Sequence, residues 1–233
     1  MLAEFLLEAL DDHLVAEALR CLIHYCQSDD TPPAALPIET IVAPAPIAIR
    51  EHVTVILRKN ALLVGKETNG LQLVSLSPTA TAEYREVATK LARYATALDA
   101  WHFPNMAPGL VSAREVAIQK GVLLFNHHLF FEVHEILEEQ WKQETGEIRL
   151  FLQGLIQIAV AFHHLGNRNF RGATALLHDG LVKITPHQPA FLAIELRDFI
   201  AHLKTCQQEL QRLGPERLQL FSLEMIPSIR FVA

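Results

Sequence analysis

The chain has 233 residues, and half of them are apolar, which is enough for a sizeable core in one or two domains. Its formal net charge of −6 argues against a broad nucleic-acid-binding surface, which is usually basic. Three cysteines without a CxxC pair argue against a zinc finger, and they favour a reducing cytoplasm.

The first part of the chain is expected to mix helix and sheet. Residues 2–27 lack the basic start of a signal peptide, and their apolar spacing predicts one helix. Dense prolines predict an extended connector at about 31–46. The β-branched run 52–64 predicts a strand, and residues 71–76 alternate well enough for another. Asn69-Gly70 is a hairpin-type turn signal between them.

A helix at about 79–101 should follow this sheet, because Ser77 suits its cap and Pro78 its first turn. The prolines after this helix mark the best domain boundary. We therefore predict a mainly α protein. A small α+β region with an antiparallel hairpin or three-stranded sheet occupies residues 1–110, and an all-helical bundle occupies residues 111–233.

The bundle is expected to contain five helices separated by short turns. Ser112 is the predicted cap of the first, which ends near Phe125. The others are expected from the turn after Asn126 to about 145, at 147–165, at 170–184, and from just after Pro189 to Gly214. The tail beyond Gly214 is apolar without a helical pattern, and Pro227 indicates that it wraps around the bundle.

The third helix of the bundle is apolar on nearly every side, as expected for a central helix. Its longest apolar run, residues 150–165, falls short of the roughly 20 residues of a membrane span, so we expect no membrane association. Gln153, Gln157 and His164 fall in one stripe of this helix. Buried polar groups need partners, so we expect His134 to face this stripe.

Helical spacing places Glu138 one turn after His134, on the same side of the second bundle helix. Glu135 lies further round, and Glu132 and Glu139 are expected in solvent. Our central hypothesis is that His134 and Glu138 meet Gln157 and His164 across a helix–helix contact. The binding or buried polar network predicted here consists of Asn126, His134, Glu138, Gln153, Gln157 and His164.

Three interpretations of this network stay open. A buried, satisfied network would fix the register of the helices. A divalent metal such as zinc, manganese or iron would suit His134, Glu138 and His164 as ligands, with Glu135 as a fourth. Acid–base chemistry without a metal would use His134 beside Glu135 and Glu138. The chain lacks both the HExxH motif and the paired ExxH motifs of di-iron bundles.

A family resemblance rests on these same residues. The pattern is Phe125-Asn126, then Phe131-Glu132-x-His134-Glu135-x-x-Glu138-x-x-Trp141, then Gln153-Gly154-x-x-Gln157-x-Ala159, His164, and Asn169-x-x-Gly172-Ala173. It resembles the bacterial and archaeal "domain of unknown function" family numbered 309, over roughly residues 112–184. The resemblance implies a compact helical bundle and no activity. His128 is a departure, since such sequences often have a small or turn-forming residue there.

The expected function is a non-enzymatic interaction or self-association module, because the chain is rich in apolar residues and shows no complete catalytic constellation. Its partner would be a second copy or another protein. The alternative is a metal-dependent or acid–base hydrolase-type enzyme using His134, Glu138 and His164. Arg197 and His202 also match the loose Arg-x4–6-His pattern of helical ribonuclease-type domains, a pattern that arises easily by chance.

Overall fold

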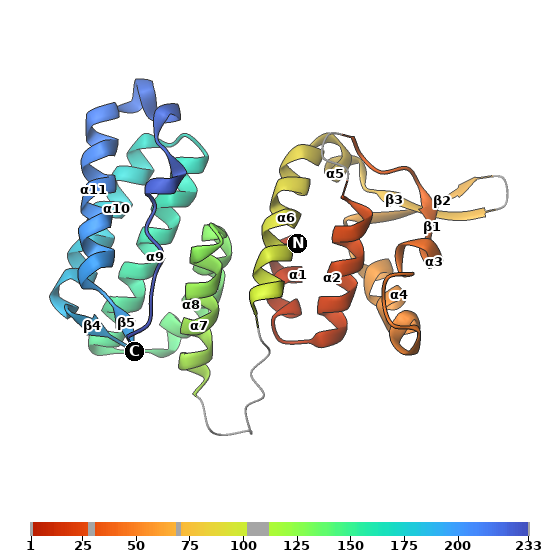
Figure 1. Ribbon diagram of the computed structural model, residues 1–233, viewed down its shortest axis with the longest axis horizontal. Helices are drawn as coiled ribbons and strands as arrows, with labels where there is room; N and C mark the ends of the chain where they lie inside the picture. The colour runs from red at the N-terminus through yellow and green to blue at the C-terminus, as the bar shows by residue number, and fades with distance from the viewer. Residues whose placement is uncertain (1, 28–30, 69–70, 102–111, 233) are drawn as a thin grey trace. The chain divides into compact units, whose positions relative to one another are not determined.

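The computed structural model describes residues 2–27, 31–68, 71–101 and 112–232 (Figure 1). The chain forms two compact units, Met1–Pro104 and Asn105–Ala233. The expected boundary between residues 110 and 111 lies outside the described residues. The fold is mainly α, with a small antiparallel sheet in the first unit and a helical bundle in the second.

The single helix expected at 2–27 is wrong, because the first unit begins with two helices. These are α1 (Leu2–Ala9) and α2 (His13–Tyr25). Asp12 interrupts them: its side chain accepts hydrogen bonds from the backbone N–H groups of Leu14 at 2.7 Å and Val15 at 3.3 Å. A carboxylate that caps α2 in this way favours a new helix start over a continuous helix.

The strand expected at 52–64 is also wrong over most of its length. Residues Arg50–Lys59 form helix α4, which buries Val53 and Leu57 completely. These two residues are four apart, so they share one helix face, and α4 packs that face near α2. Burial of one helical face therefore outweighs the β preference of the branched residues in this stretch.

The three-stranded sheet consists of β1 (Leu36–Pro37), β2 (Leu63–Thr68) and β3 (Leu71–Leu76) in the order β1-β3-β2. All its pairings are antiparallel, and the pairing of Thr68 with Leu71 closes the expected hairpin. The turn residues 69 and 70 lie outside the described residues. The expected connector at 31–46 contributes β1 and a short helix, α3 (Ile38–Ile41), and a 3-10 turn follows at Ile47–Ile49.

Ser77 caps a helix as expected, since its hydroxyl accepts a hydrogen bond from the Ala80 N–H at 3.3 Å. That helix, α5 (Pro78–Ala82), is short, and α6 (Tyr84–Ala100) follows it, so the expected helix at 79–101 is divided in two. The Tyr84 hydroxyl donates to the Cys26 carbonyl at 2.9 Å and ties α6 to the end of α2.

The second unit contains the helices expected from the sequence, with small shifts at their ends. They are α7 (Ala113–Asn126), α8 (Phe130–Gln143), α9 (Gly146–Gly166), α10 (Phe170–Ile184) and α11 (Arg197–Leu213). Ser112 and Glu115 form a reciprocal capping box at the start of α7. His128, which departs from the family pattern, has a φ of 58°. It therefore adopts the left-handed conformation that a turn-forming residue would supply at this position.

The last bundle helix was expected to begin just after Pro189, and this expectation is wrong, because α11 begins at Arg197. A small hairpin of β4 (Ala190–Phe191) and β5 (Ile194–Glu195) comes first, turning through positive φ angles at Leu192 and Ala193. The tail then follows two 3-10 turns, Pro215–Leu220 and Leu223–Met225, and runs back along the bundle to this hairpin (Figure 1). A hydrogen bond of 2.8 Å from the Val232 N–H to the Ala193 carbonyl anchors it there.

Helix α9 forms the centre of the second unit and packs against both α8 and α10. Four phenylalanine rings pack edge to face or tilted around Phe125, with centroids 5.3–6.0 Å apart: Phe125, Phe130, Phe162 and Phe199. At 21 residues, α9 is long and apolar enough to cross a membrane by length and composition alone. Half of its apolar stretch is buried inside the unit, and core helices of soluble proteins have the same length and composition.

Candidate functional site

The histidine at the centre of the family pattern lies on the surface of α8, where two carboxylates flank it. His134 Nδ1 is 2.9 Å from Glu135 Oε1, and its Nε2 is 3.6 Å from Glu138 Oε2. Lys142 Nζ extends the row at 3.2 Å from Glu138 Oε1. The side chains of His134 and Glu138 are 32% and 35% exposed, so solvent screens this row and its ion pairs add little stability.

An exposed aromatic ring lies beside this histidine. Phe131 is 40% exposed, and its ring centroid is 6.2 Å from that of His134 and 5.7 Å from that of His163 on α9. We call Phe131, His134, His163, Glu135 and Glu138 the Phe131 face. Sequence reasoning overlooked it, although Phe131 falls outside the apolar face of α8, and a large apolar residue off that face is the available signal.

Glu132 was expected in solvent, and this expectation is wrong. Its exposed fraction is 1%, and the Lys120 side chain of α7 is similarly buried at 3%. Neither side chain is without a partner. Helix α7 packs against α8, so the first turn of α8 is covered and Glu132 is shielded from water. A buried carboxylate in the family pattern therefore contributes to the interior of the bundle.

The predicted network between His134 or Glu138 and the glutamine stripe has no support. Gln157 Oε1 is buried and accepts no hydrogen bond among the described residues. His134 and Glu138, its expected partners, bond instead to carboxylates and a lysine of their own helix. Gln153 is half-buried on the same helix. The Trp141 Nε1 is a second buried polar atom without a hydrogen-bond partner in the described part of the chain.

His164 belongs to the turn that joins α9 to α10. The Oδ1 of Asn169 accepts a hydrogen bond from the Gly172 N–H at 3.0 Å, which caps α10. Its amide nitrogen therefore donates to His164 Nδ1, at 3.2 Å. A Cβ at Gly172 would lie 2.7 Å from His164 Cδ2, so the imidazole needs glycine there. Three residues of the family pattern thus build one helix–helix turn.

Asn126 holds the C-terminal tail. Its Nδ2 donates to the Ile229 carbonyl at 2.9 Å, and its Oδ1 accepts from the Ile229 N–H at 2.8 Å. The two bonds satisfy both backbone groups of a residue that is 5% exposed. The role of Asn126 is therefore a contact between residues 103 positions apart, which no local pattern could indicate.

The predicted metal ligands do not come together as a set. The residues that the structure describes contain no group of three or more His, Cys, Asp or Glu side chains placed to hold a metal ion. His134 and Glu138 are neighbours, whereas His164 is engaged with Asn169. A divalent metal at these three residues stays a prediction, and so does a role for Glu135 as a fourth ligand.

Burial changes the acid–base behaviour of groups around the bundle core. It lowers the pKa of His127, at the C-terminal end of α7, below its ordinary value of 6.5. It raises the pKa of the Cys206 thiol to about 11 and that of the Cys26 thiol to about 12. Cys21 is buried as well, and its thiol pKa is also raised, mainly by burial. The three cysteines therefore lack the depressed thiol pKa of a reactive cysteine.

Comparison with known proteins places the same segment in a family. Residues 118–176 match the family described as Domain of unknown function (DUF309). Within the chain, 53 residues are 42% identical to the uncharacterized protein YpuF of Bacillus subtilis (strain 168). This match covers 22% of the present chain and 30% of the Bacillus protein. The matched family segment runs from the middle of α7 into α10, so it includes the Phe131 face and the turn at His164.

Proposed function

Because the chain carries a DUF309-type domain at residues 118–176, we propose that this domain is a non-enzymatic protein-binding module and that the Phe131 face is its contact surface. The observation that carries the proposal is the 40% exposure of Phe131 between two imidazole rings. A large aromatic side chain exposed to water stabilises the folded chain little. It gains most when a partner covers it.

The charges beside Phe131 indicate the chemistry of the partner. Glu135 and Glu138 lie on the same helix as Phe131 and are each more than a third exposed. The exposed Glu139 adds to this acidic surface. A partner segment with one apolar residue flanked by lysine or arginine would cover the Phe131 ring and pair with the glutamates.

A second copy of the chain fits this face less well. In a symmetric dimer the same patch of both subunits meets, so Glu135 and Glu138 of one copy would approach the glutamates of the other. Like charges brought together and desolvated oppose association. We therefore favour a different, basic protein over self-association through α8.

Site-specific photocrosslinking in cells, followed by measured affinities, tests the proposal. A photoreactive phenylalanine at position 131 should capture a basic partner segment. The same group at position 182 should not, since Val182 of α10 is 58% exposed and outside the Phe131 face. With that partner purified, Phe131→Ser and Glu138→Lys should each weaken binding about tenfold, and Val182→Ser should not.

Equal crosslinking at the two positions, or an affinity that Phe131→Ser leaves unchanged, would refute the proposed contact surface. Capture of a second copy, together with a dimer in analytical ultracentrifugation that Phe131→Ser dissociates, would replace the basic partner by self-association.

An enzyme remains the second candidate, and the observation that favours it is the 2.9 Å contact between His134 and Glu135. A carboxylate at Nδ1 orients an imidazole so that its other nitrogen can exchange a proton. The metal-dependent version, with His134, Glu138 and His164, is tested by elemental analysis of tag-free protein and by thermal unfolding with added Zn²⁺ or Mn²⁺. Bound metal or a clear rise in the unfolding temperature would support that version, whereas no metal and an unchanged temperature would remove it.

A further inference from the structure

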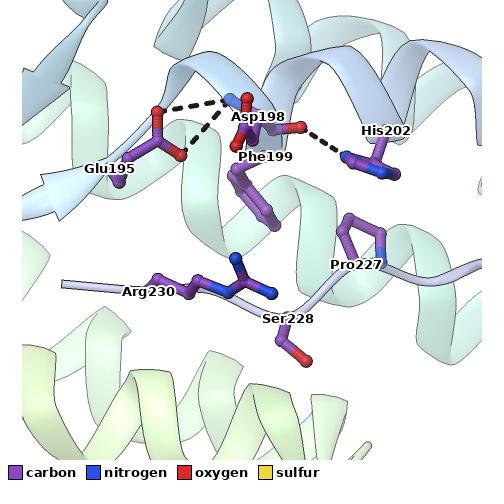
Figure 2. Close-up of a pocket in the computed structure, with 7 residues that line it drawn as sticks. All are labelled: Glu195, Asp198, Phe199, His202, Pro227, Ser228 and Arg230. Carbon is purple, nitrogen blue, oxygen red and sulfur yellow. Dashed lines mark hydrogen bonds between the residues drawn. The ribbon is translucent and has the colours of Figure 1, made fainter.

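A separate polar pocket lies where the start of α11 faces the C-terminal tail (Figure 2). Its cavity volume is about 140 Å³. Asp198, Phe199 and His202 of α11 line one wall, and Ser228 and Arg230 of the tail line the other. The volume suits a molecule of amino-acid size better than a nucleotide or a drug-sized ligand, whose pockets run to about 300–1,000 Å³.

Both walls are held in place by hydrogen bonds. Glu195 Oε1 accepts from the N–H groups of Arg197 at 2.7 Å and Asp198 at 3.2 Å, which fixes the first turn of α11. The tail is tied to the same residue, because the Glu195 N–H donates to the Arg230 carbonyl at 2.9 Å. The clamp between Asn126 and Ile229 fixes the tail one residue earlier. The pocket is therefore a built feature of the fold.

The imidazole in this pocket is oriented. His202 Nδ1 lies 2.8 Å from the Asp198 carbonyl oxygen, which can only accept, so Nδ1 carries the proton (Figure 2). In the neutral ring Nε2 is then an acceptor. Arg197, the other residue of the loose ribonuclease-type pattern, donates its backbone N–H to the Glu195 carboxylate and is not among the residues that line the pocket.

Two opposite charges in the pocket have no ion-pair partner among the described residues. They are the Asp198 carboxylate on the α11 wall and the Arg230 guanidinium on the tail wall, both at exposed positions that solvent reaches. Figure 2 shows the guanidinium extended between Phe199 and Ser228. Phe199 is 2% exposed and closes the floor of the pocket from the core side, and the half-buried Pro227 supplies apolar surface beside the charged groups.

The charge pattern excludes simple ions as preferred ligands. Glu195 already neutralises the positive end of α11, so a phosphate would find one arginine and two carboxylates. A simple cation would meet the Arg230 guanidinium. A ligand that carries both charges satisfies both walls at once.

We propose that this pocket binds a free α-amino acid with an apolar side chain. Its carboxylate would pair with the Arg230 guanidinium and accept from the Ser228 hydroxyl. Its ammonium group would donate to the Asp198 carboxylate and His202 Nε2. Its side chain would pack on Pro227, above the buried Phe199. This site is independent of the Phe131 face, so either proposal stands if the other fails.

Isothermal titration calorimetry of the full chain with each of the twenty amino acids tests this proposal. At least one apolar amino acid should bind saturably. Its N-acetyl derivative, which lacks the ammonium charge, and its amide, which lacks the carboxylate, should each bind at least about tenfold more weakly. Inorganic phosphate at the same concentrations should not compete.

Matched variants separate the two ends of the ligand. Arg230→Gln should weaken amino-acid binding at least about tenfold and leave the amide derivative's affinity unchanged. Asp198→Asn should also weaken amino-acid binding at least about tenfold, and it should leave the affinity of the N-acetyl derivative unchanged. Arg171→Gln and Asp179→Asn, at exposed positions of α10 outside the pocket, should bind as the parent does. No saturable binding by any apolar amino acid, a derivative that binds as tightly as the free amino acid, or competition by phosphate would overturn the assignment.

Discussion

Helix α9 has two neighbours, α8 and α10, and they pack against it in different ways. On the α10 side, a Cβ at Gly154 would lie 3.1 Å from the Gly180 carbonyl oxygen, and one at Gly180 would lie 2.8 Å from the Gly154 carbonyl oxygen. The two backbones therefore approach each other across a pair of glycines. Helix α8 instead carries the exposed Phe131, the half-exposed His134 and a Trp141 Nε1 without a hydrogen-bond partner in the described ranges of the chain.

The difference separates a contact that serves the fold from a helix that carries exposed polar and aromatic groups. A contact between glycine backbones leaves no room for a side chain, so it specifies how α9 and α10 pack and little else. Helix α8 keeps polar and aromatic groups where they contribute little to folding. Residues that are poorly used by the fold are the ones available for a partner, which is why we place the contact surface on α8.

Disrupting the glycine contact should produce the largest effect. In Gly180→Ala the new Cβ would lie 2.6 Å from Ile158 Cγ1 and against a backbone oxygen, so the helices must separate. We expect a loss of about 3 kcal/mol in the free energy of unfolding by urea denaturation, despite the better helix propensity of alanine.

Gly121→Ala on α7 is the matched variant for the side nearer α8. The three atoms nearest to its Cβ would all belong to the Leu137 side chain, at 3.0–3.3 Å, and that flexible side chain can move. Its cost should stay below about 1 kcal/mol. Equal losses for the two variants would contradict the contrast between the two sides of the bundle.

A polar clamp should carry the next largest effect. Asn126→Ala removes two hydrogen bonds to the buried Ile229 backbone, each with a net value of about 1 kcal/mol. We expect a loss of about 2 kcal/mol of unfolding free energy and a tail that proteases cleave faster near Ile229. Asn167→Ala, at an exposed position, is the control. The same loss of about 2 kcal/mol without faster cleavage near Ile229 would argue against the clamp.

The sign of a third change tests whether α9 contains a polar network at all. Gln157→Leu removes a buried oxygen that accepts no hydrogen bond from the residues that the structure describes, so we expect a gain of about 1 kcal/mol in unfolding free energy. A satisfied network with His134 would instead predict a loss of about 1–3 kcal/mol. Urea denaturation distinguishes these outcomes, and a loss in the variant would restore the network hypothesis.

The smallest effect should be a change in pH dependence. Burial lowers the pKa of His127 below 6.5, so the unfolded chain binds that proton more readily than the folded chain. The contribution of His127 to the folding stability is complete above about pH 6.5, and it is lost as the pH falls through the lower pKa of the folded chain. His127→Gln should therefore flatten the fall in melting temperature between about pH 7 and pH 5.

His178→Gln, at an exposed position of α10, should retain the parent slope and serves as the control. If the melting temperature of His127→Gln falls as steeply with decreasing pH as that of the parent, other groups dominate the loss of stability at low pH.

Local signals in the sequence predicted the bundle well. Ser112 and the spacing of apolar residues located α7 to α10 within a few residues, because caps and helical periodicity are encoded locally. The same reasoning failed at Arg50–Lys59, where β-branched residues form a helix that buries Val53 and Leu57. It also failed at Glu132, since spacing along one helix does not show which neighbouring helix covers it.

The candidate sites were harder to predict than the elements that carry them. The sequence indicated that His134 and Glu138 share a helix face, because four residues make about one turn. The place of Phe131 off the apolar face of α8 was the one available signal of its exposure, but nothing in the sequence indicated that it would lie beside His163 or that Asn126 would hold Ile229. The pocket at Asp198 and Arg230 joins residues from two separate segments, and neither segment has a motif of its own.

The amino-acid sequence by itself therefore determined the helical class, most helix ends in the bundle and the family segment, since these depend on spacing, caps and local pattern. Tertiary structure alone decided which polar side chains are buried, which are exposed and which charges face each other across a pocket. The physical reason is that burial and charge pairing depend on contacts between segments distant in the chain, and those contacts form only when the helices pack.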